Sequence, residues 1–158
     1  MEPQQIMDAF VDALRETLST MAMLELEVDA VEPTPDGAIQ AEVAATIGLS
    51  GAGRGMLLVT VSPQLAPIIA ASMLGMAPEE IGPDEAGDTI SELANMIAGG
   101  AKRAFAGTEY AFNLSLPTRL VGEKPAIAPP HDVPGALMRG RVSGETLQLA
   151  VWLQRGEA

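Results

Sequence analysis

The chain contains no cysteine, which excludes disulfide bonds, zinc–thiolate centres and catalysis by a thiol. It has one histidine, His131, so a transition-metal site built on imidazole ligands is not expected. We interpret His131, in a proline-rich segment, as an ordinary exposed residue. Aromatic residues make up only 3% of the 158 residues, so the core must be built from Ala, Val, Ile, Leu and Met.

Basic residues are also scarce, with 9 Lys and Arg against 21 Asp and Glu, for a net charge of −12. A field of this sign repels phosphates and anionic lipid, so neither nucleic acid nor a membrane surface is an expected partner. No apolar run is long enough to span a bilayer, and the polar N-terminus is unlike a secretory signal peptide. We therefore expect a cytoplasmic protein.

The length predicts a single domain over residues 1–158 with a core of its own. Apolar residues recur every three or four positions over 4–21 and over about 84–106, which predicts two long helices. A shorter helix is predicted between them, over about 62–74. Residues 122–135 contain four prolines and predict a loop.

Alternating or continuous apolar patterns predict six strands. They cover residues 24–30, 39–49, 55–61, 112–116, 136–142 and 146–154. The first of them has one acidic, solvent-facing side. The order of helix, three strands, two helices and three strands favours an α+β fold, in which about three helices cover a largely antiparallel six-stranded sheet.

The second long helix carries a row of polar residues. Asp88, Glu92 and Asn95 are spaced by four and three residues, so at about 100° per residue they share one face with Gly99. The opposite stripe is apolar and consists of Ile90, Leu93, Ala94, Ile97, Ala98, Ala101, Ala104 and Phe105. Such a row is most often an ordinary solvated helix face. Because it faces away from the core, it is also placed for chemistry on another protein.

Pro117 follows Asn95 after twenty-one intervening residues, and the full pattern is Asp88-x3-Glu92-x2-Asn95-x21-Pro117. This pattern resembles the active site of the CheC/CheX/FliY chemotaxis phosphatases. The run from Glu92 to Gly99 is similar to the motif helix of the CheX branch, and the order of elements is similar over nearly the whole chain. The resemblance implies a CheX-like fold.

The resemblance also implies an activity. The chain would be a phosphatase that hydrolyses the aspartyl phosphate of a phosphorylated response regulator, a CheY-like receiver, in bacterial chemotaxis or related two-component signalling. It would have no cofactor of its own, because the receiver supplies Mg²⁺, and it would form a homodimer. The alternative is a non-catalytic module of the same fold that binds a receiver or a flagellar-switch partner.

Glu92 and Asn95 are the predicted catalytic residues. A carboxamide can both accept from and donate to a water molecule, so Asn95 suits the task of directing it at the phosphorus. Glu92 would pair with a lysine beside the phosphosite of the receiver. Asp88, Met96 and Gly99 are predicted to contact the receiver, although Met96 is equally well read as a helix-packing residue. Pro117 is predicted to be structural, since it cannot donate to a strand ladder.

The first long helix carries a partial copy of this pattern. Asp12-x3-Glu16-x2-Ser19 repeats the two acids, but serine replaces asparagine. Ala41 stands where the proline would fall. Some relatives carry one site in each half, and we expect the first half of this chain to have no working site.

Overall fold

The computed structural model describes residues 3–35, 37–121, 126–128, 130 and 132–156. The helices are α1 (Pro3–Ala22), α2 (Leu65–Leu74), α3 (Pro83–Phe105) and a 3-10 turn, η1 (Pro78–Glu80). The strands are β1 (Leu26–Pro33), β2 (Ile39–Gln40), β3 (Val43–Gly51), β4 (Gly53–Val61), β5 (Phe112–Leu114), β6 (Thr118–Val121), β7 (Ala126–Ile127), β8 (Gly135–Val142) and β9 (Glu145–Arg155).

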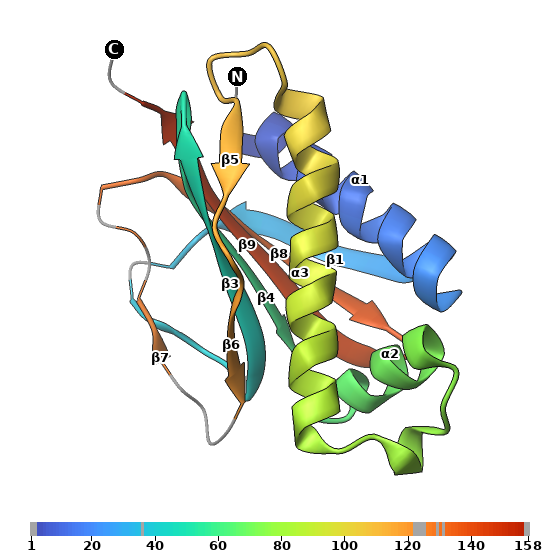
Figure 1. Ribbon diagram of the computed structural model, residues 1–158. Helices are drawn as coiled ribbons and strands as arrows, with labels where there is room; N and C mark the ends of the chain where they lie inside the picture. Colours follow the sequence, from blue (N-terminus) through green and yellow to red (C-terminus); the bar gives the residue numbers. More distant parts are fainter. Residues whose placement is uncertain (1–2, 36, 122–125, 129, 131, 157–158) are drawn as a thin grey trace.

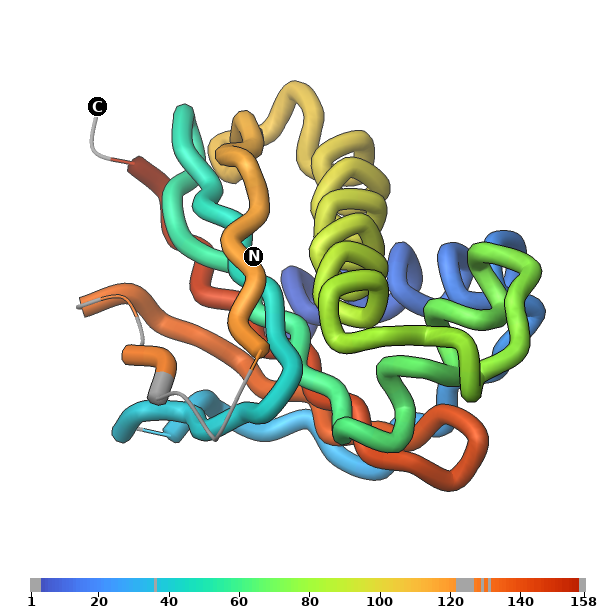
Figure 2. Tube along the Cα trace, turned by 60° about the horizontal axis from the view of Figure 1, so that its bottom comes forward, coloured from blue at the N-terminus to red at the C-terminus, as the bar shows by residue number. Residues whose placement is uncertain are grey.

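Seven of the strands form one antiparallel sheet. Its order is β1-β8-β9-β4-β3-β5, and β6 also pairs with β3. Helices α1, α2 and α3 all lie on one side of this sheet, as Figure 1 and the turned view in Figure 2 show. The predicted α+β fold, with helices covering a largely antiparallel sheet, is confirmed.

The seventh strand, β6, lies just beyond the predicted strand 112–116, which ends early. β5 ends at Leu114 and β6 begins at Thr118, and both pair with β3. Pro117 lies in the break, so the predicted disturbance of the strand is observed. The connecting segment is held to β3, because Ser115 donates its N–H to the Gly48 oxygen (3.0 Å) and its hydroxyl accepts from the Gly48 nitrogen (2.8 Å).

The main core lies between the helices and the sheet. All three phenylalanines meet there, with ring centroids 5.9 Å apart for Phe10–Phe105, 6.0 Å for Phe10–Phe112 and 5.9 Å for Phe105–Phe112. This cluster joins α1, the last turn of α3 and β5. Ala104 was placed in the buried stripe by periodicity, but it is exposed. The stripe ends in Phe105, whose burial fixes the rotation of the last turn.

A second, smaller core covers the other side of the sheet. The two-stranded sheet of β2 and β7 packs there against Leu58, Leu137 and the fully buried Trp152. β7 falls within the segment 122–135 that was predicted to be a loop, so that prediction is wrong at residues 126–127. Residues 122–125, 129 and 131 of this segment, His131 included, lie outside the described residues.

β1 is an edge strand, and its predicted alternation is only partly observed. Leu26 is buried, but Val28 is exposed, because a register shift between Val28 and Ala30 breaks the two-residue period. Its acidic residues pair with arginines of β8, with Glu32–Arg139 at 2.6 Å and Asp29–Arg141 at 2.9 Å. The hydrogen bonds from Arg141 lower the pKa of the Asp29 carboxyl group.

Candidate active site

Local sequence fixes where α3 begins and which way it faces. Pro83 occupies the first turn, and the Glu85 carboxylate accepts a hydrogen bond from the Gly82 N–H at 3.0 Å. Lys102 and Arg103 lie in the last turn, where they complement the helix dipole. The apolar stripe is buried against α1 and the sheet, apart from Ala104, and the opposite side of the helix is therefore turned to solvent.

The three polar residues of the row all lie on this solvent-facing side. Asp88, Glu92 and Asn95 are exposed, whereas Ile90, Leu93, Ala94 and Ile97 between them are buried. Within the part of the chain that the structure describes, neither the Glu92 carboxylate nor the Asn95 carboxamide makes a hydrogen bond or an ion pair. Both groups are therefore free to bind an external partner.

Asp88 is engaged, in contrast to the two residues that follow it in the row. Its Oδ1 accepts a hydrogen bond from Arg119 Nη1 at 2.7 Å. Arg119 lies on β6, two residues after Pro117, and its Nη1 also donates to the backbone oxygen of Asp84 at 3.0 Å. In the free protein the Asp88 carboxylate thus has an internal partner. Its predicted contact with the receiver stays a prediction.

Sequence reasoning missed Arg119, and the residue that makes room for it is Gly87. A Cβ atom at Gly87 would lie 3.2 Å from Arg119 Cδ and 2.9 Å from Val121 Cγ2, so β6 packs directly on the backbone of α3. The signal available in the sequence was a glycine inside the predicted helix, next to the first acid of the row, since glycine is costly inside a helix.

The remaining predicted residues lie around the row. Met96 is half-buried on its flank, a position compatible with both of its interpretations. Gly99 has open space where a side chain would be, with nothing within 4 Å of an added Cβ. Pro117 lies in the strand break and is half-buried. Leu116 beside it is 89% exposed, which the alternating pattern of 112–116 did not indicate.

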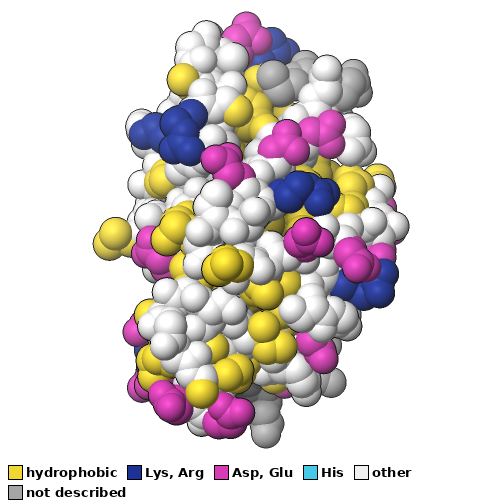
Figure 3. Space-filling view, turned by 90° about the vertical axis from the view of Figure 1, so that its right-hand side faces the viewer, with side chains coloured by type: hydrophobic (Ala, Val, Ile, Leu, Met, Phe, Trp, Pro, Cys, Tyr) yellow, Lys and Arg dark blue, Asp and Glu magenta, His cyan; other side chains and the backbone are white. Residues whose placement is uncertain are grey.

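The helix-covered side of the molecule carries scattered acidic side chains, with basic and apolar side chains between them (Figure 3). Among the described residues there is no group of three or more His, Cys, Asp or Glu arranged to hold a metal ion. No helix of the described chain is long and apolar enough to cross a membrane.

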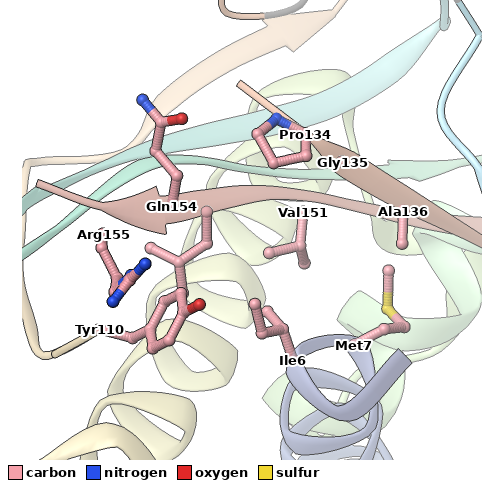
Figure 4. Close-up of a pocket in the computed structure, with 10 residues that line it drawn as sticks. Ile6, Met7, Tyr110, Pro134, Gly135, Ala136, Val151, Gln154 and Arg155 are labelled. Carbon is pink, nitrogen blue, oxygen red and sulfur yellow. The ribbon is translucent and has the colours of Figure 1, made fainter. Parts of the chain in front are cut away.

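One cavity of the fold lies away from the row. It measures about 320 Å³ and is formed by the first turn of α1, the ends of β8 and β9, and Tyr110 (Figure 4). Its floor is apolar, with Ile6, Met7 and Val151, while Arg155 at its edge is paired with Glu109 at 3.0 Å. No residue of the row lines this cavity, so the row is an open surface site.

Comparison with known proteins gives the row a context. The family described as chemotaxis phosphatase CheX matches residues 43–139, which is more than half of the chain and includes the row and Pro117. No match is found among the curated proteins.

Solved structures resemble the chain over nearly its whole length. A CheC-like superfamily protein from Shewanella sp. PV-4 is 29% identical, with a TM-score of 0.84 and coverage of 94% of this chain and 97% of that one. The chemotaxis protein CheX from Vibrio vulnificus is 27% identical, with a TM-score of 0.84 and coverage of 95% and 99%.

A more distant structure is the CheX–CheY–BeF3–Mg²⁺ complex from Borrelia burgdorferi. It is 17% identical, with a TM-score of 0.76 and coverage of 95% and 98%, and at that identity the likeness shows the fold alone. The family match, which covers the motif helix and its proline, goes further than the fold. The chain therefore belongs to the CheX family of chemotaxis phosphatases.

Proposed function

We propose that this chain hydrolyses the aspartyl phosphate of a phosphorylated CheY-like receiver, and that the exposed row on α3 performs the reaction. The observation that carries the proposal is the pairing state of Glu92 and Asn95. Both side chains face solvent one turn apart, without a partner among the described residues. Membership of the CheX family and the likeness to a CheX found in complex with CheY support the same activity.

Hydrolysis of an acyl phosphate needs a water molecule in line with the bond that breaks, together with compensation of the developing charge. Water attacks the phosphorus, and the bond between phosphorus and the aspartate oxygen breaks. The aspartate carboxylate is released, and the phosphate carries away both hydrogens of the water. The receiver's own Mg²⁺ compensates the charge, so the phosphatase needs only to place the water.

Asn95 is suited to that placement. Its carboxamide oxygen accepts a hydrogen bond from the water, and its NH₂ group donates to a phosphoryl oxygen, which fixes the direction of attack. Glu92 lies one turn before it and binds a lysine of the receiver beside the phosphosite. A carboxylate next to a phosphoryl group would otherwise be repelled, so that lysine must lie between the two anions.

The partner is thus a receiver domain that carries its own divalent cation, and this chain supplies no metal. The protein acts as a homodimer, as the resemblance to the CheX branch implies, and it acts in the cytoplasm, as the composition of the chain predicts. Chemotaxis is the pathway that the family name indicates.

The test measures phosphate loss from a Mg²⁺-loaded, phosphorylated receiver of the same organism, with the wild-type protein and with Asn95→Ala. We expect the wild type to accelerate the loss of phosphate. Asn95→Ala should lower the accelerated rate about 100-fold, because the water is no longer positioned. The matched control is Ser19→Ala, which shortens the corresponding exposed residue of α1 and should leave the rate unchanged.

Binding of the receiver separates the two functions of this fold. If Asn95→Ala binds the receiver as tightly as the wild type does but fails to turn it over, the phosphatase is established. If the wild type binds receivers without accelerating the loss of phosphate from any of them, the chain is a binding module and the proposal is wrong.

A further inference from the structure

We propose that Arg119 is a positioning residue for Glu92 and Asn95, an inference that rests on the proposed function. Arg119 is not part of the Asp88–Glu92–Asn95–Pro117 pattern. It lies on β6, opposite Ala45 of β3, and its side chain crosses to the N-terminal half of α3. The strand break at Pro117 allows β6 to form there as a separate strand.

One guanidinium group holds two successive turns of the motif helix. Nη1 of Arg119 donates to Asp88 Oδ1 at 2.7 Å and to the Asp84 backbone oxygen at 3.0 Å. Nη2 lies 3.5 Å from Asp84 Oδ1. The planar guanidinium of an arginine suits such a bridge because it presents five donors in a fixed fork, whereas a lysine ammonium has three donors on a single nitrogen.

The packing beneath this bridge leaves little freedom. Gly87 lies between the two bridged turns, and an added Cβ would approach Arg119 Cδ and Val121 Cγ2 to 3.2 Å and 2.9 Å. The backbone of α3 therefore lies directly on β6. At the other end of the helix, Phe105 is clamped between Phe10 and Phe112. The helix is therefore fixed near both ends, by Arg119 at one and by Phe105 at the other, and Glu92 and Asn95 lie between these contacts.

The position of the helix matters because the proposed reaction depends on direction. Glu92 and Asn95 lie one and two turns beyond Asp88, so a change of tilt at Asp88 moves both of them. A displacement of about 1 Å from the productive geometry can cost up to about 100-fold in rate.

Arg119 also compensates charge. Asp84, Asp88 and Glu92 would together present three carboxylates to a phosphorylated partner, and the guanidinium lies against the first two. The ion pair itself is open to water, with side chains 41% exposed at Arg119 and 75% at Asp88, so it contributes little to stability. Its effect should therefore appear in turnover and not in unfolding.

The experiment compares Arg119→Gln with Arg139→Gln in the phosphatase assay. Arg139 is a matched control, because it is also half-exposed, pairs with a carboxylate at 2.6 Å and lies on β8, away from the row. Both changes remove one positive charge. We expect Arg119→Gln to lower kcat about tenfold, Arg139→Gln to leave kcat within about twofold, and both to unfold at nearly the same temperature as the wild type.

A double mutant then tests whether Arg119 affects turnover through Asp88. If Arg119 acts through Asp88, Asp88→Ala combined with Arg119→Gln loses no more activity than Arg119→Gln alone. Arg119→Lys, which keeps the charge and disturbs packing least, should fall between Arg119→Gln and the wild type and serves if Arg119→Gln folds poorly.

The inference is overturned if Arg119→Gln and Arg139→Gln have equal kcat values. It is also overturned if Asp88→Ala raises KM alone and its effect adds fully to that of Arg119→Gln, because Asp88 would then bind the receiver directly. Failure of the wild type to accelerate phosphate loss is a separate result, which removes the proposed function itself.

Discussion

Helices α1 and α3 pack against each other on the same side of the sheet, and each presents two acids at the same spacing to solvent. On α1 the row is Asp12, Glu16 and Ser19, and all three are exposed. On α3 it is Asp88, Glu92 and Asn95. The two helices therefore share burial, spacing and charge. They differ in the third side chain and in what the neighbouring strands contribute.

Those differences show that an acidic helix face is not in itself a site. A serine hydroxyl rotates freely, whereas a carboxamide offers an acceptor and a donor in one plane. α3 also has a strand break at Pro117 and an arginine from β6 against its first acid, while Ala41, at the corresponding place for α1, is an ordinary buried residue. The chemistry proposed for α3 thus depends on its carboxamide and on two features beside the helix, the strand break at Pro117 and the arginine of β6.

After the Asn95→Ala variant, the largest difference between the rows on α1 and α3 is expected from the middle acid of each row. Glu92→Gln should raise KM for the phosphorylated receiver about tenfold, because it removes a charge-assisted hydrogen bond to the partner's lysine. The corresponding change on α1, Glu16→Gln, should leave KM unchanged. Steady-state kinetics on both variants measure this, and equal KM values would place the receiver on a different surface.

A smaller effect is expected from the adjacent glycines Gly99 and Gly100. An added Cβ meets nothing within 4 Å at Gly99, but lies 3.0 Å from the Ala13 Cβ at Gly100. Gly99→Ala should therefore raise the free energy of unfolding by about 0.5–1 kcal/mol, since alanine is the better helix former. The same change at Gly100 should lower it, because α1 must move away.

Activity adds a second measurement on the same pair. If a partner's backbone approaches closely at Gly99, the stabilised Gly99→Ala variant should show a KM raised severalfold with kcat nearly unchanged. Chemical denaturation gives the stabilities, and receiver titration gives KM. A stabilised variant with wild-type KM would show that Gly99 does not contact the receiver.

The smallest change is expected from an attempt to rebuild the site on α1. Ser19→Asn in an Asn95→Ala background gives α1 the same three residue types as the wild-type row. We expect no recovery of phosphatase activity, because among the described residues no arginine of a strand pairs with an acid of that row, and Ala41 stands where the proline would fall. Recovery of a substantial fraction would mean that spacing alone makes the site, and that Arg119 is dispensable.

The amphipathic pattern of α3 was enough to predict its limits and its exposed row, because a helix of this length repeats its period several times. The residues that hold it were not predictable in the same way. Arg119 lies thirty-one positions from Asp88, and no local period links a strand residue to a helix residue at that distance. β7 has only two residues and carries no period. The strand predicted over 39–49 is divided into β2 and β3, which belong to different sheets. The alternation of β1 does not match its burial, because the register shift between Val28 and Ala30 breaks the period.

The pairing of β1 with β8 has a consequence for how the chain acquires its structure. Leu26 near the start of the chain is aligned with Val142, while α3, β3, β4, β5 and β6 lie within one continuous stretch, residues 43–121. The pairings of β3 with β5 and β6 close shorter loops than the β1–β8 edge does, and that edge must wait for nearly all of the chain to be synthesised. We expect residues 43–121, which carry the row, to fold first. Helix α1, although it is synthesised early, should dock last together with β1. Order of assembly, as well as side-chain chemistry, thus separates the two helices.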